Sequence, residues 1–475
     1  MLERAYTPMN DTLEQDISAL GKAIFSDLSG YNNSPLERGY WNTLFTRLTI
    51  NLPELRTSLF RLVDVLPALD SDDIILRHLL EYLYKPLAEY HPALGCLLRL
   101  GEARPLRRIT ATLVRRSVAE MAKVFIAGET PLEAIPQLNR LLAHGQSFTV
   151  DLLGEYSLSE QEAILYLERY LEVVDTLDKH LSPVSNSNRT HKSSVCISIK
   201  LSALYSQIDS LNFESSVNIL SDRLSRIARA VEQVSGTLYV DAEDSKYNPI
   251  VYETFKRVFG SEEFKLIPHP GIVVQAYSRD ALDITNDLLQ FAADRGAPIA
   301  VRLVKGAYWD SEQVIASQNN WSCPLFSVKE HSDANFEDIS KLLLDNTSLC
   351  RPAFASHNIR SLTHACCYAE RNGLGKDTFE IQVLYGMADA IANTFTHRGY
   401  QTRFYAPIGK LIPGMGYLVR RLLENSSNES FIRHTFFEPT AIEKLLAKPA
   451  PIRSQQLIHD INTKPEFELT LSFHY

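Results

Sequence analysis

Residues 1 to about 145 carry apolar side chains at intervals of three and four residues, which is the spacing of one face of an α-helix. The clearest stretches are DIILRHLLEYLYKPLAEY (73–90) and ITATLVRRSVAEMAKVFI (109–126). No alternating strand pattern and no internal repeat is visible in this part. We expect prolines to divide the pattern into several short helices, at Pro53, Pro67, Pro86, Pro131 and Pro136. The pattern therefore predicts an all-helical arm or small helical domain.

From about residue 147 the pattern changes to short β-branched or aromatic strings, each followed by an amphipathic stretch. Eight strings are predicted as strands, at 148–153, 194–199, 237–242, 271–277, 299–304, 353–356, 379–384 and 402–406. Helices are predicted at 160–180, 213–234, 248–258, 280–294, 336–346, 359–371 and 386–396, with a last one near 415–425. Eight strand–helix pairs over roughly 280 residues predict an α/β fold of the (β/α)8 barrel type. An open doubly wound sheet is the structural alternative, but the glycine-rich first turn typical of it is missing.

Composition narrows the class of protein further. The 475 residues are 45% hydrophobic and 22% charged, with a formal net charge of −9, so no basic field favours nucleic acid as a partner. The six cysteines form no CxxC pair and no HExxH motif is present, so we expect no metal site. No signal peptide and no apolar run of ~18 residues is visible, so a cytoplasmic location is expected.

The predicted domains are a helical arm and helical domain over 1–145, a barrel over 146–430 and a tail over 431–475. Catalytic groups of a parallel barrel gather at the C-terminal ends of its strands. Cations are unusually dense there for an acidic protein: Lys200 ends the second strand, Arg302 lies within the fifth strand and Lys305 lies just beyond it. A lysine in this position also suits a Schiff-base lyase or aldolase that uses Lys200, and this alternative stays open.

The segment after the eighth strand, YAPIGKLIPGMGYLVRRLLE, contains two adjacent arginines, Arg420 and Arg421. Paired guanidinium groups suit the bidentate capture of a carboxylate or phosphate. A solvated helix face with an internal pair between Glu424 and an arginine is the alternative interpretation.

Seven blocks in order resemble the proline dehydrogenase family: SIKLSALY (198–205), YVDAED (239–244), VVQAY (273–277), VRLVKGAYWD (301–310), ASHN (355–358), EIQVLYGM (380–387) and YAPIGKLIPGMGYLVRRLLEN (405–425). The resemblance is closest to the proline dehydrogenase module of bifunctional proline utilisation A, and it covers most of 147–430. It implies a distorted (β/α)8 barrel that binds FAD and oxidises L-proline to Δ1-pyrroline-5-carboxylate. Hydride would pass to flavin N5 and electrons onward to a quinone, with peripheral contact at the inner face of the cytoplasmic membrane.

The resemblance also implies roles for individual residues. Those expected at the substrate are Lys200, Leu303, Tyr308, Tyr405, Arg420, Arg421 and Glu155, and those expected to be catalytic are Lys200, Asp241, Arg302 and Tyr405. The expected FAD contacts are Asp241, Gln275, Arg302, Val304, Lys305, Gly306, Ala307, Trp309, Ser327, Lys329, Ser356, His357, Asn358, Gln382 and Glu424. A zwitterionic amino acid needs cations for its carboxylate, which agrees with the two arginines and Lys200.

The chain departs from the family pattern in three places. Ser327 and Ser332 stand where threonines are usual around the phosphate-binding lysine, here Lys329. No basic DNA-binding segment precedes the helical part, so no repressor role is expected. No aldehyde dehydrogenase half follows the barrel, so either a monofunctional enzyme or a piece of a bifunctional one is expected. A catalytically inactive scaffold is the non-enzymatic alternative, and the intact cations argue against it.

Overall fold

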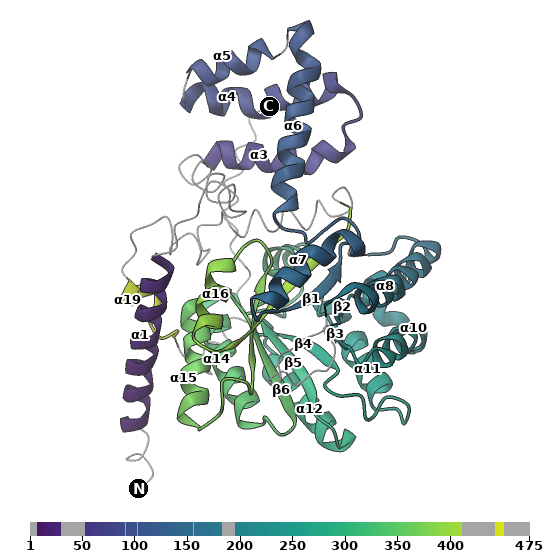
Figure 1. Ribbon diagram of the computed structural model, residues 1–475, viewed down its shortest axis with the longest axis vertical. Coiled ribbons are helices and arrows are strands. Elements are labelled where there is room, and N and C mark those ends of the chain that lie inside the picture. The colour runs from purple at the N-terminus through teal and green to yellow at the C-terminus, as the bar shows by residue number, and fades with distance from the viewer. Residues whose placement is uncertain are drawn as a thin grey trace.

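The computed structural model describes residues 7–29, 53–90, 92–101, 103–154, 156–182, 195–410 and 442–450. Its centre is a closed barrel of eight parallel strands in the order β1 to β8, with β8 pairing back to β1 (Figure 1). The strands are β1 Ser147–Leu152, β2 Cys196–Ile199, β3 Thr237–Val240, β4 Gly271–Gln275, β5 Ile299–Val304, β6 Cys350–Ala355, β7 Glu380–Leu384 and β8 Gln401–Ile408. The (β/α)8 prediction is confirmed, and each strand overlaps the string that predicted it.

The helices that follow the strands surround the barrel (Figure 1). They are α8 Glu160–His180, α9 Leu201–Leu204, α10 Phe213–Gln233, α11 Asn248–Phe259, α12 Ala281–Arg295, α13 Trp309–Gln318, α14 Lys329–Asp345, α15 Ile359–Arg371 and α16 Asp389–His397. Single 3-10 turns lie at Ser210–Asn212 and Ser245–Tyr247. The sequence did not predict α13, and it placed the start of α14 seven residues too late, at 336 instead of Lys329.

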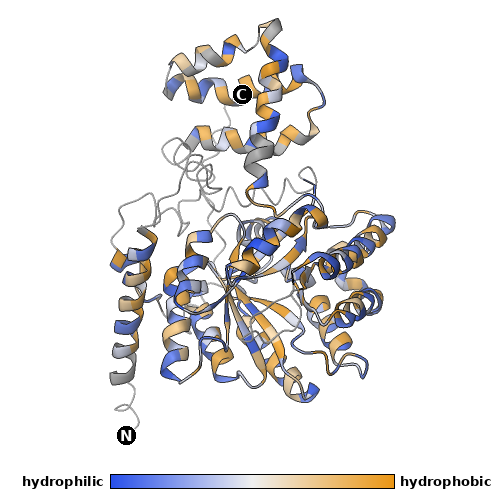
Figure 2. Cartoon of the chain, viewed as in Figure 1, coloured by the Kyte–Doolittle hydropathy of each residue, from blue (hydrophilic) through white to orange (hydrophobic). Residues whose placement is uncertain are grey.

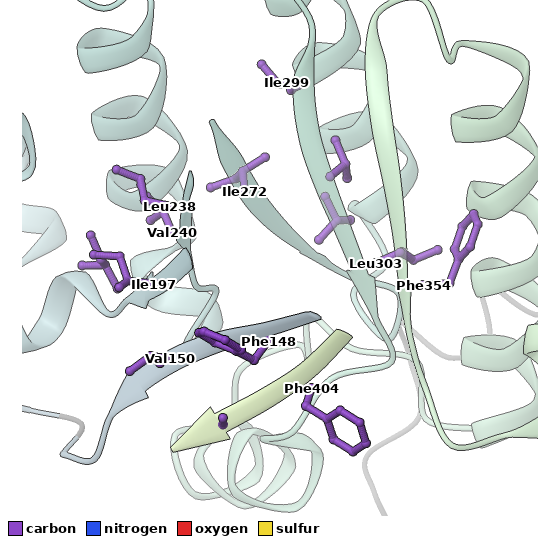
Figure 3. Packing of buried hydrophobic residues seen from close by; sticks show 14 of the residues in the cluster. Phe148, Val150, Ile197, Leu238, Val240, Ile272, Ile299, Leu303, Phe354 and Phe404 are labelled. Atoms are coloured by element: carbon purple, nitrogen blue, oxygen red, sulfur yellow. The ribbon is translucent and has the colours of Figure 1, made fainter. Parts of the chain in front are cut away.

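Strand alternation explains why the barrel is stable. Phe148, Val150, Ile197, Val240 and their equivalents on the other strands point outward and pack in one continuous cluster with the surrounding helices (Figure 3). The intervening residues point into the barrel and are largely polar. Hydrophobic residues therefore alternate with polar ones along the strands, and the helices also carry both hydrophobic and hydrophilic residues (Figure 2).

The N-terminal helices are α1 Thr7–Ser29, α3 Pro53–Val65, α4 Asp72–Tyr90, α5 Pro92–Leu100, α6 Arg104–Lys123 and α7 Pro131–Ala143, with a 3-10 turn at Leu66–Ala68. The prediction that Pro86 and Pro136 end helices is wrong, because both lie inside a helix. Packing of α4 through Leu76, Leu79 and Leu83 against its neighbours outweighs the cost of ~3 kcal/mol for an interior proline. None of the helices in the described ranges is long and apolar enough to cross a membrane.

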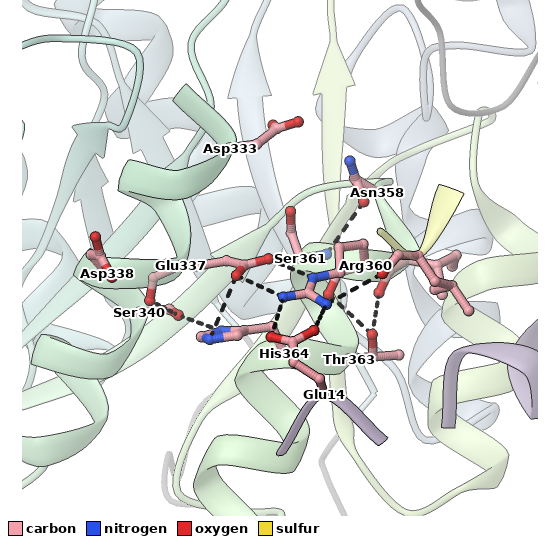
Figure 4. A network of polar contacts seen from close by, with 12 residues as sticks. Glu14, Asp333, Glu337, Asp338, Ser340, Asn358, Arg360, Ser361, Thr363 and His364 are labelled. Atoms are coloured by element: carbon pink, nitrogen blue, oxygen red, sulfur yellow. Dashed lines mark hydrogen bonds and ion pairs between the residues drawn. The ribbon is translucent and has the colours of Figure 1, made fainter. Parts of the chain in front are cut away.

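Helix α1 lies alongside α15 and α16 of the barrel (Figure 1). Its anchor is Arg360, which is 4% exposed and sits between two carboxylates (Figure 4). Arg360 donates to Glu337 on α14 at 2.7 and 2.9 Å and to Glu14 on α1, one of these bonds at 3.0 Å. The short helix α19, Ile442–Leu445, is joined to the same arginine by the carbonyl of Leu446, at 3.2 Å. The predicted C-terminal tail otherwise lies outside the described residues.

Candidate active site

The polar groups at the C-terminal mouth of the barrel converge on the carboxylate of Asp241, directly after β3. Asp241 accepts hydrogen bonds from Arg302 Nη1 at 2.8 Å and from Ser198 Oγ at 2.7 Å through one oxygen. Its other oxygen accepts from the Tyr405 hydroxyl at 2.8 Å. Residues from four strands or strand ends therefore meet at one carboxylate, because their side chains all point inward. Three of these four, Asp241, Arg302 and Tyr405, were predicted as catalytic from the sequence.

Lys200, the fourth predicted catalytic residue, lies beside this group. Its Nζ is 2.5 Å from Asp151 and 3.4 Å from the Tyr405 hydroxyl. Burial alone would lower the pKa of Lys200, but Asp151, Tyr405 and Asp241 hold it well above its ordinary value. Burial raises the pKa of Asp151 to about 6 against the opposing effect of Lys200, so the pair is charged at neutral pH. Lys200 is therefore an ammonium group in this site.

A Schiff-base lysine has to be a free amine, and such lysines have a lowered pKa. The raised pKa of Lys200 is the opposite of this requirement. Burial also raises the pKa of Tyr405 well above its ordinary value, so its hydroxyl stays protonated. The site thus offers fixed cations and a neutral hydroxyl rather than an amine nucleophile.

Two buried side chains of the barrel have polar atoms that the described part of the protein leaves without a partner and that are therefore available to a ligand. Among the described residues, Arg302 Nε and Nη2 and Gln275 Oε1 have no hydrogen-bond partner, although both side chains are 3% exposed. Such atoms are costly unless a ligand pairs with them. Gly306, just beyond β5, has φ +126°, and a Cβ there would come within 2.4 Å of the Tyr277 ring. Only glycine allows the Tyr277 ring to approach the backbone this closely.

The remaining predicted cofactor contacts lie on the loops after β5, β6 and β7, and several are held by the protein itself. Lys305 pairs with Asp333, and burial lowers its pKa despite this partner. Trp309 Nε1 donates to the carbonyl of Phe326 at 2.8 Å. Val304 ends β5, and Ala307 follows Gly306. Lys329 is the first residue of α14, two residues after Ser327, so both predicted contacts lie at the start of that helix.

On the next two strands, bonds within the protein orient the predicted residues. His357 Nε2 accepts the backbone N–H of Leu384 at 3.1 Å, and Ser356 Oγ accepts that of Asn358 at 3.1 Å. The Asn358 side chain caps α15. Gln382 donates to Glu380 at 2.6 Å, deeper in the barrel.

Leu303 is placed where it cannot line the substrate. It is fully buried in the outer cluster with Phe354, because it alternates with the inward-facing Arg302 (Figure 3). Its predicted role at the substrate ring is therefore not retained. Leu384, the last inward position of β7 beside Tyr405 on β8, is the leucine at the mouth. Tyr308 follows the loop after β5, immediately before α13. Four predicted residues lie outside the described residues: Glu155, Arg420, Arg421 and Glu424.

Sequence reasoning missed several residues in the site. Asp151 and Ser198 were not assigned roles, although Asp151 accepts a hydrogen bond from Lys200 and Ser198 donates one to Asp241. Glu243 is buried and accepts the Ser202 N–H at 3.1 Å together with the Ser202 hydroxyl. Burial raises the pKa of Glu243 to about 7, and its bonds to Ser202 fix the turn just after Lys200.

Comparison with known proteins agrees with this geometry. The proline dehydrogenase family model matches residues 134–434, and the model of the proline utilization A N-terminal domain matches residues 14–125. The bifunctional protein PutA of Escherichia coli is 29% identical over 336 residues, which are 69% of this chain and 25% of that protein. Proline dehydrogenase 2 of Bacillus subtilis is 28% identical over 312 residues, covering 64% of this chain and 87% of that protein.

A solved structure shows the same architecture. Proline utilization A from Bdellovibrio bacteriovorus, inactivated by N-propargylglycine, has a TM-score of 0.83 and 38% identity, over 92% of this chain and 44% of that one. The chain thus spans a quarter of the Escherichia coli relative and less than half of this structural relative. The family model covers well over half of the residues. The chain belongs to the proline dehydrogenase family.

Proposed function

We propose that this chain oxidises L-proline to Δ1-pyrroline-5-carboxylate with bound FAD and passes the electrons to a quinone. The observation that carries the proposal is the pair of buried, unpartnered groups at the mouth, Arg302 Nε and Nη2 beside Gln275 Oε1. A donor pair and an amide oxygen on the adjacent strands β5 and β4 suit the polar edge of an isoalloxazine ring. FAD, when bound, supplies the acceptor for the hydride that leaves the ring carbon next to the nitrogen of proline.

The protein's own residues would bind and orient the substrate. The Lys200 ammonium, kept charged by Asp151, would attract the carboxylate of proline, together with Arg420 and Arg421 by family resemblance. Tyr405 and Leu384 would enclose the ring and exclude water. The amine of proline has to lose a proton before oxidation, and that proton is expected to pass to solvent. Tyr308 and Glu155 are proposed to support and close this site.

Cofactor binding is proposed along the β5–β7 loops. Arg302 would face flavin N5, where a cation stabilises the charge gained on reduction, and Asp241 would hold this arginine in place. Gln275 would face the pyrimidine edge. The flavin and its ribityl chain would lie along the backbone of 304–307 and against Trp309. The remaining proposed FAD contacts are Lys305, Ser327, Lys329, Ser356, His357, Asn358, Gln382 and Glu424.

N-propargylglycine inactivates the Bdellovibrio bacteriovorus relative. This compound is a secondary amino acid, as proline is, so we propose that it also inactivates this chain. We also propose that the protein contacts the membrane peripherally. The proposed domains are a helical part over 1–145, the barrel over 146–430 and a tail over 431–475.

Proline-dependent reduction of an artificial dye by the purified protein tests the function. Lys200→Met removes one charge-assisted contact and should raise the KM for proline about 10- to 150-fold, from ~1.5–3 kcal/mol. Lys246→Met, at an exposed lysine on the rim, is the matched control and should leave KM unchanged. Reduction of a substrate adduct onto Lys200 by borohydride, with no dye reduction by proline, would instead show a Schiff-base enzyme.

A further inference from the structure

Directly beneath the charged groups of the mouth lies an aromatic side chain that the proposed function does not use. Tyr239 on β3 points inward, two residues before Asp241, and is 3% exposed. The Arg302 guanidinium carbon lies over its ring, 4.1 Å from the ring centroid. The ring therefore contacts the arginine from the side opposite the barrel mouth.

The neighbouring strands leave space for this ring. Gly271 on β4 is in register with Tyr239, and a Cβ on Gly271 would lie 2.2 Å from Tyr239 Cδ1. Two small side chains, Cys196 on β2 and Ala300 on β5, form a buried cluster with the tyrosine. Any side chain larger than hydrogen at position 271 would have to displace the ring. The sequence of three other strands is therefore fitted to an aromatic residue at position 239.

The far end of the ring is also fixed. The Tyr239 hydroxyl is 3.4 Å from Glu380 Oε1, a long hydrogen bond, and Glu380 is held by Arg403 Nε at 2.8 Å. Burial alone would raise the pKa of Glu380, but Arg403 and Gln382 lower it to about 2, so this support is charged at neutral pH. The ring thus rests on a permanent ion pair in the lower half of the barrel.

We propose that Tyr239 is a positioning residue that sets the height and orientation of Arg302 under the bound cofactor. Asp241 and Ser198 hold only Nη1 of the guanidinium, so they leave its plane free to tilt. Contact with the Tyr239 ring removes this freedom, and Nε and Nη2 then stay directed at the ligand. The aromatic face also stabilises the cation where water is excluded. This inference rests on the proposed function, because Arg302 is the cation assigned to the flavin.

Three variants of the FAD-loaded protein test the proposal. Tyr239→Leu removes the aromatic face, and Tyr239→Phe keeps the ring and removes only the long hydroxyl contact. Phe354→Leu is the control, since Phe354 is a fully buried aromatic residue of the outer cluster that does not contact Arg302. The midpoint potential of bound FAD is measured by equilibration with reference dyes during chemical reduction, so this readout does not depend on proline. The kcat and KM for proline are measured separately.

We expect Tyr239→Leu to lower kcat about tenfold with KM nearly unchanged, which is the scale of one desolvated cation–π contact. The same tenfold change in the stability of reduced flavin corresponds to a potential about 30 mV lower for a two-electron couple. Tyr239→Phe and Phe354→Leu should keep the wild-type potential. A folded, flavin-bound Tyr239→Leu protein with the wild-type potential would overturn the proposal, as would an equal drop in Phe354→Leu.

If Tyr239→Leu does not fold, Gly271→Ala provides the same test by displacing the ring that contacts Arg302. The midpoint potential of FAD bound to Gly271→Ala should then differ from that of the wild type. An unchanged potential in this variant would also refute the inference. Failure of the proposed function gives a different result, because wild-type protein would then bind no flavin or would not reduce it with proline. Bound flavin that proline does not reduce still allows the potentials of the variants to be compared.

Discussion

Replacement of Asp241 by alanine removes the carboxylate on which the mouth of the barrel is organised. Asp241 accepts three hydrogen bonds, from Arg302, Ser198 and Tyr405. The side chain of Arg302 is 3% exposed and that of Asp241 is 10% exposed. After the substitution, Arg302 is a buried cation whose hydrogen-bonded carboxylate is gone.

The magnitude follows from this burial. Removal of one partner of a buried, hydrogen-bonded ion pair costs ~3–5 kcal/mol, because the other charge stays desolvated. The control is Asp287→Ala, which breaks an ion pair with Lys256 whose side chains are 57% and 28% exposed. Exposed pairs of this kind contribute ~0–1 kcal/mol. The two variants should therefore differ by several kcal/mol in the free energy of unfolding.

The assay is urea denaturation of flavin-free protein, so that cofactor binding does not add to the stability. Asp241→Ala should unfold at a clearly lower urea concentration than both wild type and Asp287→Ala, with a similar dependence on urea. Equal midpoints for the two variants would refute the reasoning, since they would show that Arg302 does not depend on Asp241 for compensation of its charge.

Three further predictions address other parts of the molecule. Glu380, whose pKa is lowered from 4.5 to about 2, contributes stability above pH 4.5 that is lost as the pH falls toward 2. The unfolding free energy of wild type should fall over this range by roughly 3 kcal/mol more than that of Glu380→Gln, and parallel curves in acid denaturation would contradict this. Arg360→Met should destabilise the protein by ~3–5 kcal/mol, whereas Arg371→Met, at an exposed ion pair with α1, should cost under ~1 kcal/mol; equal melting temperatures would disprove the anchoring role. Arg421→Met should raise the KM for proline ~10-fold or more while flavin stays bound, and an unchanged KM would remove Arg421 from the substrate site.

The barrel could be predicted from the sequence because its strands are short apolar strings separated by amphipathic helices of regular length. Helix α13 was missed since WDSEQVIASQ buries only Glu312 and Ala316, so no hydrophobic face marks it. The predicted helix ends at Pro86 and Pro136 were wrong because tertiary packing outweighs the low helix propensity of proline. A helix without a hydrophobic face and a proline tolerated inside a packed helix are both invisible to a method that reads hydrophobic spacing and proline positions.

The candidate site was predicted in part. Lys200, Asp241, Arg302 and Tyr405 were named from the sequence, and they lie together in the structure. Leu303 was misplaced because the phase of alternation was not applied: Arg302 points inward, so its neighbour must point outward. The same phase would have identified Ser198 and Tyr239, each an even number of residues from a predicted catalytic residue. Contacts between strands, such as the fit of Gly271 to Tyr239, depend on barrel register and need the structure.

Anaerobic titration of the purified protein with L-proline, followed by visible absorbance, tests the central claim most directly. The proposal predicts the bands of oxidised FAD before addition and their complete loss with proline, and Lys200→Met should need far more proline for the same change. Protein that carries no flavin after incubation with FAD, or flavin whose spectrum proline leaves untouched, would contradict it.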